Sequence, residues 1–324
     1  MLDFELIKRF VSDEKLPIQV IKDENYFNYI LDLLEDTFGS RTKWNGWLDI
    51  IESHYSGDSK KYLADFYKIR ESIIVDMKAN EAYQEFNTGD MNKYRIIDMP
   101  PQLGSYEIYR PGNHGKYYLS LDLKKANFQA LRFAKVIKED TYEDWLKNWT
   151  DLPHLLKSKY LRVVVFGQLN PGRHITVEKY ITSEIYKQIE QSKILENIAK
   201  PVSFRNDELI WEVPNEEVKT MAELLNQGHL SKLIAESGFS VSLDFFKLRG
   251  FEFIQDATQN KVNFYKKEHD CEDIIDTYHC IPGTYQAIIT KLLSKKDLVD
   301  YDTWFMHDGM LSKFIGNFKI EEVI

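Results

Sequence analysis

Three acidic residues lie where the sequence predicts that strands end. Asp122 is near the end of an apolar segment at residues 116–123, and Asp207 and Glu208 lie between two short apolar runs, as at a hairpin tip. A hairpin that pairs beside the first strand would bring the three carboxylates together. A carboxylate at a strand end beside an acidic pair on a neighbouring hairpin is an arrangement that holds two divalent cations for phosphoryl transfer.

Each of these acidic residues also has an ordinary structural explanation. A helix is expected to begin near Lys124, so Asp122 could be the N-cap residue of that helix. Asp207 and Glu208 could form a plain polar turn, since Asn206 followed by Asp207 is a common turn pair. The sequence alone does not choose between these explanations and a metal site.

The chemistry of a carboxylate cluster indicates which cation it would take. Clustered carboxylates repel one another and raise one another's pKa values, so a site that gathers them usually contains cations. Ligation by carboxylates alone favours Mg²⁺ or Mn²⁺ over zinc. Two such ions, about 3.5–4 Å apart, would activate a 3′-hydroxyl and stabilise a leaving pyrophosphate. We therefore expect Asp122, Asp207 and Glu208 to be both catalytic and metal-binding.

Basic residues that could meet a triphosphate follow the first acidic residue and recur in the middle of the chain. They are Lys124, Lys125, Arg132, Arg162 and Arg173. The net charge of −9 argues against a nucleic-acid partner, but affinity for a phosphate backbone depends on local positive charge. Residues 157–205 carry more basic than acidic side chains. This excess indicates a phosphate-binding surface or a solvated helical face.

The elements that must position these side chains follow a β-α-β-β-α-β order. Strands are predicted at 116–123, 202–213 (as a hairpin) and 239–254, with helices between them. This is the ferredoxin-like pattern, which puts the end of the first strand beside the hairpin tip. Residues 163–166 are a short apolar run that fits a strand or a buried helix, and residues 311–318 are predicted to form a short helix.

The chain divides into three predicted parts. Residues 1–99 form a helical N-terminal region, and prolines near residue 100 break the helical pattern. Residues 100–255 form the catalytic core, and residues 256–324 form a small C-terminal extension. The predicted fold class is α+β, with an antiparallel sheet in the core.

The central motifs resemble those of a polymerase palm domain. Residues 120–128 (SLDLKKANF) are similar to motif A, most of all to the reverse-transcriptase version, in which alanine follows the metal-binding aspartate by four residues. Residues 206–209 (NDEL) resemble motif C, with the Asp-Glu-Leu of A-family DNA polymerases. Weaker similarities place motif B at residues 167–171 (GQLNP) and motif D at residues 235–247.

The resemblance implies roles for particular residues. Asp122 and Asp207 would be metal ligands, with Glu208 as a third. Asn127 stands where reverse transcriptases carry an aromatic residue that senses the sugar 2′ position, so it would contact the substrate. The partners would be a nucleic-acid primer and template and nucleoside triphosphates, with the segments before residue 100 and after residue 255 as finger- or thumb-like parts.

Composition excludes several other classes of protein. No apolar run approaches the ~18–20 residues that a membrane helix needs, and residues 1–6 lack the basic-then-apolar pattern of a signal peptide. The two cysteines, Cys271 and Cys280, fit no common zinc spacing and no disulfide framework. We therefore expect a cytoplasmic protein with no membrane partner.

The predicted function is a metal-dependent nucleotidyltransferase that resembles a template-dependent polymerase. Two alternatives remain. One is another two-metal phosphoryl-transfer enzyme on a ferredoxin-like core, such as a nucleotide cyclase. The other is a non-catalytic module with a palm-like fold that binds nucleic acid or protein.

Overall fold

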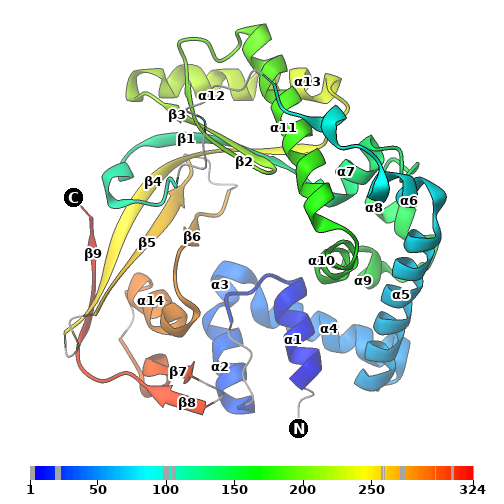
Figure 1. The fold of residues 1–324 in the computed structure, drawn as a ribbon. Helices are drawn as coiled ribbons and strands as arrows, with labels where there is room; N and C mark the ends of the chain where they lie inside the picture. Colours follow the sequence, from blue (N-terminus) through cyan, green and yellow to red (C-terminus); the bar gives the residue numbers. More distant parts are fainter. Residues whose placement is uncertain are drawn as a thin grey trace.

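The computed structural model describes residues 4–18, 23–97, 103, 107–256, 258, 260–270, 274–295, 297–307 and 310–323. Within them the protein is an α+β structure in which helices flank one antiparallel sheet (Figure 1). The predicted class and the helical N-terminal region are thus confirmed. None of the described helices is long and apolar enough to cross a membrane.

The N-terminal helices are fixed by local caps and by a shared apolar core. They are α1 (Phe4–Asp13), α2 (Glu24–Leu33), α3 (Glu35–Phe38), α4 (Ser40–Tyr55), α5 (Ser59–Ala79) and α6 (Glu81–Thr88), followed by the 3₁₀ turn η1 (Asn92–Tyr94). Asp23, Asp58 and Asn80 accept backbone hydrogen bonds at the first turns of α2, α5 and α6. These caps satisfy amide donors that a helix start leaves free.

The main sheet has the order β2-β3-β1-β4-β5-β6, and β9 also pairs with β4. Its strands are β1 (Tyr117–Leu123), β2 (Lys200–Arg205), β3 (Glu208–Val213), β4 (Val241–Gln255), β5 (Asn260–Glu268), β6 (Thr277–His279) and β9 (Phe318–Glu322). The order β2-β3-β1-β4 is the ferredoxin-like arrangement that the sequence predicts. A separate hairpin pairs β7 (Trp304–His307) with β8 (Met310–Lys313).

Most of the remaining helices connect the core strands. They are α7 (Ala126–Phe133), α8 (Tyr142–Leu146), α9 (Pro153–Leu156), α10 (Lys159–Gln168), α11 (Pro171–Ser192), α12 (Val218–Asn226), α13 (His229–Glu236) and, after the core, α14 (Gln286–Leu293). Further 3₁₀ turns are η2 (Pro111–Asn113), η3 (Asn215–Glu217), η4 (Gly283–Tyr285) and η5 (Asp300–Thr303).

The two faces of the sheet have different surroundings because side chains alternate along a strand. Leu119, Leu121 and Leu123 of β1 belong to the main apolar core, together with residues of α7, α11, α12 and α13. The opposite face carries a smaller apolar cluster that includes Tyr118, with Ile108 packed over it. The even-numbered residues of β1, including Asp122, therefore lie on the face turned away from the main core.

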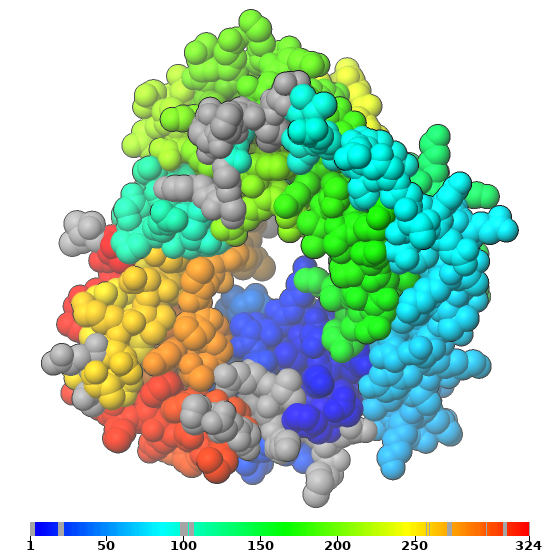
Figure 2. Space-filling view, viewed as in Figure 1, coloured from blue at the N-terminus to red at the C-terminus, as the bar shows by residue number. Residues whose placement is uncertain are grey.

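The molecule is a ring around a central opening. Figure 2 shows this opening bordered by the N-terminal helices (blue), α11 (green) and the β6 region (orange). Figure 1 shows α12 and α13, which pack on the face of the sheet that carries Leu121, on the outer side of the sheet. The face that carries Asp122 is consequently the face that looks toward the opening.

The sheet continues beyond the predicted core. The boundary proposed at residues 255/256 falls at the turn between β4 and β5, whose pairing runs from Lys247 with Glu268 to Gln255 with Asn260. β9 adds five further pairs to β4. The other boundary, at residues 99/100, lies outside the described residues.

The structure resolves one alternative that the sequence left open and corrects one predicted helix. Residues 163–166 belong to α10, which Ser158 caps by accepting from the Leu161 amide. The helix expected at residues 311–318 is wrong, because this segment forms β8 and the beginning of β9. Leu311, Phe314 and Phe318 have helical spacing, but Phe314 instead stacks on Phe305, 4.0 Å away between ring centroids. Pairing with β7 overrides the local pattern.

Truncation of Leu121 tests the packing of β1 against the helices. Leu121 is 0% exposed in the main core, so Leu121→Ala should lower the free energy of unfolding by about 2–5 kcal/mol. Urea denaturation followed by circular dichroism measures this change. As a control, Val75→Ala at a 61% exposed position should change it by about 0.5 kcal/mol or less. Equal effects of both variants would contradict the buried position of β1.

Candidate active site

The register of β1 with β3 brings Asp122 and Glu208 together. These residues are direct partners across the two antiparallel strands, so their side chains leave the same face of the sheet. Asp207 is in the turn just before β3, and its carbonyl oxygen accepts from the Leu123 amide at 2.8 Å. The structure thus places the three acidic residues predicted from the sequence next to one another.

Asp122 is not the N-cap residue of the helix that follows it. β1 continues through Asp122 to Leu123, and the N-cap position of α7 is occupied by Lys125, whose side chain makes no capping hydrogen bond. The backbone of Lys125 has a positive φ of 51°. This turn ends the strand sharply and leaves the Asp122 carboxylate free of any role in starting α7.

The carboxyl group of Asp122 is held in an unfavourable environment for its charge. Burial raises its pKa, and the neighbouring carboxylates of Asp207 and Glu208 raise it further, to about 6. The side chain is exposed to water, but surrounding protein weakens its hydration. Lys15 and Lys267 act in the opposite direction and lower this pKa. The charged form of Asp122 therefore lacks full compensation in the protein alone.

A polar strip continues from the acidic residues across the sheet. Ser120 Oγ donates to Glu208 Oε1 at 2.9 Å, and Ser120 is the register partner of Asp244 on β4. Asp244 in turn accepts from Lys267 Nζ at 2.7 Å and lies 2.8 Å from His269 Nε2. These partners lower the pKa of Asp244 although burial opposes them. Asp244 is thus neutralised by its neighbours, unlike Asp122.

Glu178 of α11 is a fourth acidic residue, which the sequence reasoning missed. It is 4% exposed and accepts from Asn127 Nδ2 at 2.5 Å. Burial, and then the Asp207 charge, raise the pKa of Glu178 to about 7. Its signal in the sequence is a glutamate within an apolar helical stripe with Ile181, since residues three apart share a helix face.

A group of cations interacts with the acidic residues. Burial lowers the pKa of Lys159, and nearby Lys15 and Arg162 lower it further, while Asp122 raises it. None of the ion pairs among the described residues includes Lys15, Lys159 or Arg162. Three cations held close together, with no ion pair among the described contacts, favour the binding of an anion.

Asp13 holds this group of cations in place. It accepts from Ser158 Oγ and from the Tyr160 amide, both at 2.7 Å. These bonds join the end of α1, next to Lys15, to the start of α10, which carries Lys159 and Arg162. Sequence reasoning predicted Arg162 but not the two lysines, because Lys15 and Lys159 are far apart in the chain and meet only through this tertiary contact.

The other basic candidates are placed differently. Lys125 Nζ pairs with Glu143 Oε1 at 2.5 Å, and the side chain of Lys124 is exposed. Arg132 pairs with Asp140 at 3.0 Å on the surface. Arg173 donates to the Gly89 carbonyl at the start of α11. Arg132 and Arg173 are therefore occupied by contacts within the protein.

The acidic residues have the right chemistry for Mg²⁺ or Mn²⁺, but they are not arranged as a finished metal site. Within the part of the chain that the structure describes, no group of three His, Cys, Asp or Glu side chains converges to hold a metal ion. Glu208 is engaged with Ser120. Carboxylate oxygens fit a hard divalent cation, and Glu208 would have to exchange Ser120 for it.

Comparison of the chain with models of protein families, with curated proteins and with solved structures gives no match. The chemistry of the site accordingly rests on its own residues and their geometry.

The raised pKa of Glu178 predicts a pH-dependent cost to stability. The folded-state pKa of about 7 lies above the ordinary value of 4.5, so this cost is absent below about pH 4.5 and complete above about pH 8. Glu178→Gln should therefore stabilise the protein by about 2–3 kcal/mol at pH 8 and have no effect at pH 4.5. Denaturant unfolding at the two pH values, without divalent cations, measures both.

A glutamate on the same helix provides the control. Glu184 is partly exposed and pairs with Lys187 on α11, so Glu184→Gln should change stability little at either pH. A stabilisation by Glu178→Gln that is equal at pH 4.5 and pH 8 would show that the carboxyl of Glu178 has an ordinary pKa.

Proposed function

We propose that this protein is a metal-dependent nucleotidyltransferase that adds nucleotides to a 3′-hydroxyl, as polymerases do. One observation carries the proposal: the register partners Asp122 and Glu208, with Asp207 beside them, interact with unpaired cations of α10 and the α1 end. A carboxylate cluster suits a divalent cation, and the cation group suits a polyphosphate. Phosphoryl transfer is the reaction that needs both in one place.

Asp122, Asp207 and Glu208 would hold the divalent cation. A bound Mg²⁺ or Mn²⁺ would offset the carboxylate repulsion and supply a Lewis acid that favours ionisation of the attacking hydroxyl. Asp122 would bind it in the charged form, so its pKa of about 6 makes the site weak in acid and strong above neutral pH.

Lys15, Lys159 and Arg162 would bind and orient the triphosphate. Burial, and then repulsion from Lys15 and Arg162, lower the pKa of Lys159, and this repulsion falls when a polyanion is bound. Arg162 also has its guanidinium carbon 5.8 Å from the Tyr142 ring centroid, which limits its freedom. A cation that is already positioned loses less entropy when it binds a phosphate.

The partners of such an enzyme are a nucleic-acid strand and nucleoside triphosphates in the cytoplasm. The N-terminal helices border the opening in Figure 2, and Lys15, which follows the first of them, interacts with Asp122. A strand in the opening would present its 3′ end to the face of the sheet that carries Asp122.

Loss of either central aspartate should abolish nucleotide incorporation. With Mg²⁺ or Mn²⁺, a primed strand and labelled ribo- or deoxyribonucleoside triphosphates, Asp122→Ala and Asp207→Ala should each lower the rate about a thousandfold. The reason is that each removes a ligand of the cation that stabilises the transferred phosphoryl group. Extension on denaturing gels measures the rate.

Asp140→Asn is the matched control, since this aspartate pairs only with Arg132 on the surface in the described contacts and should leave the rate within about twofold. Wild-type extension that survives both alanine variants would overturn the assignment of the site. The proposed function would be overturned if the wild-type protein extends no primer and Mn²⁺ does not change its melting temperature.

A further inference from the structure

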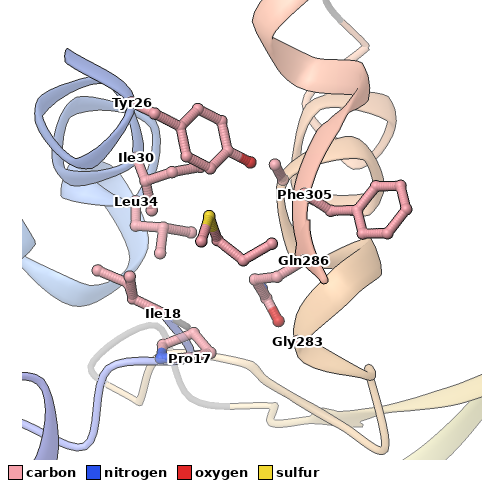
Figure 3. A pocket seen from close by; sticks show the side chains of 10 residues that line it. Pro17, Ile18, Tyr26, Ile30, Leu34, Gly283, Gln286 and Phe305 are labelled. Carbon is pink, nitrogen blue, oxygen red and sulfur yellow. The ribbon is translucent and has the colours of Figure 1, made fainter. Parts of the chain in front are cut away.

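The ring is closed where the two ends of the chain meet. α2 faces α14, η5 and β7 across a seam, which we define by Tyr26 and Tyr29 on one side and Asp302 and Trp304 on the other. Figure 3 shows Tyr26 and Ile30 of α2 and its C-cap residue Leu34 on one side of a pocket, with Phe305 and Gln286 on the other. This seam joins the first helices to the C-terminal segment and completes the circle of elements in Figure 2.

The seam is tied by two tyrosine hydroxyls. Tyr26 Oη donates to the Trp304 carbonyl oxygen, and Tyr29 Oη donates to Asp302 Oδ1. Asp302 is 0% exposed and also accepts from the Val299 amide at 2.6 Å, with Lys291 Nζ 3.7 Å away. If Tyr29 moves away, Asp302 therefore still has the Val299 amide and Lys291 as partners on the C-terminal side of the seam.

Aromatic contacts add to these ties. The Tyr29 and Tyr301 rings are stacked with 5.4 Å between centroids, and Tyr26 lies 6.2 Å from each of them. Such pairs stabilise a contact beyond the apolar area that they bury. The seam is therefore held by these ties together with the apolar core that Tyr26, Ile30 and Ala287 share.

Two cavities border the seam. A cavity of about 600 Å³ lies between Leu33 and Phe38 on the N-terminal side and Tyr278 and Leu293 on the C-terminal side. A second, small apolar cavity of about 20 Å³ separates α2 from Phe305. Atoms that border a cavity lack dispersion contacts across it, so the two sides of the seam touch over only part of their facing surfaces.

We propose that a single-stranded nucleic acid passes through the ring and that the seam is closed around it. The proposal rests on the proposed function, since it places the substrate strand of that reaction in the opening. The acidic face of the sheet borders the opening, and Lys15, which lines the large cavity of the seam, belongs to the cation group that interacts with Asp122. The seam and the site are therefore neighbours.

Enclosure restricts how a strand reaches the site. A linear strand can enter the closed ring by threading one of its ends through it. A circular strand has no end, so it can enter only when α2 separates from the C-terminal segment. Association that requires a conformational change is slower than association with an accessible surface. The closed seam also explains how an acidic protein holds a polyanion: the strand is retained by enclosure as well as by charge.

Association rates of linear and circular strands test the proposal. A fluorescein-labelled single strand is prepared in linear form, in circular form, and as a linear strand blocked at both ends by biotin and streptavidin. Stopped-flow anisotropy with the wild-type protein should show association about tenfold or more slower for the circular and blocked strands than for the free linear strand.

Removal of the tyrosine hydroxyls should open the seam without removing the rings. Tyr26→Phe combined with Tyr29→Phe should raise the association rate of the circular and blocked strands about threefold or more and leave the linear strand unchanged. The matched control is Tyr186→Phe, which loses only a hydroxyl contact with Glu190 within α11 and should change neither rate.

Each other outcome has a defined meaning. Equal association rates of the linear, circular and blocked strands with the wild-type protein would overturn the proposal that the strand passes through the ring. They would leave the proposed function intact. Equal rates of circular-strand association in the wild-type protein and the double variant overturn the role of the seam. Absence of linear-strand binding overturns the proposed function together with this proposal.

Discussion

The pairing of β1 with both β3 and β4 is the constraint on which the rest of the structure depends. A shift of one residue in this register would turn Asp122 into the apolar core and Leu121 toward the opening. The observed register places Asp122 opposite Glu208 on one side and Ser242 on the other. The burial of Leu119, Leu121 and Leu123 beneath the helices therefore fixes where the carboxylates are.

The distribution of charge around the opening follows from this placement. Asp244 has its own cations, whereas burial and the charges of Asp207 and Glu208 raise the pKa of Asp122. The positive charges of Lys15, Lys159 and Arg162 lie close together, and none of the three forms an ion pair among the described contacts. Stability alone would favour ion pairs between the carboxylates and the cations. The absence of such ion pairs among the described contacts is best explained by two ligands: a metal cation bound by the carboxylates and a polyphosphate bound by the basic residues.

Sequence patterns correctly predicted the features that are determined by residues close together in the chain. The alternation of β1, the hairpin turn at Asn206 and the order of the core elements all follow from residues close together in the chain, and Asp122 with Glu208 came from this order. The cation group, Glu178 and the seam depend on contacts between distant segments, such as Asp13 with Ser158 or Tyr29 with Asp302. The helix expected at 311–318 was wrong because pairing with β7 outweighed helical spacing.

The most direct test of the central claim is Mn²⁺ binding followed by electron paramagnetic resonance. The wild-type protein should bind Mn²⁺ at pH 7.5 and lose affinity as the pH falls through about 6, where Asp122 takes up a proton. Asp122→Asn should weaken binding about tenfold or more and remove this pH dependence, while Asp140→Asn should bind as the wild type does. Mn²⁺ binding that is absent from the wild type, or equally strong in Asp122→Asn, would contradict a cation site at the end of β1.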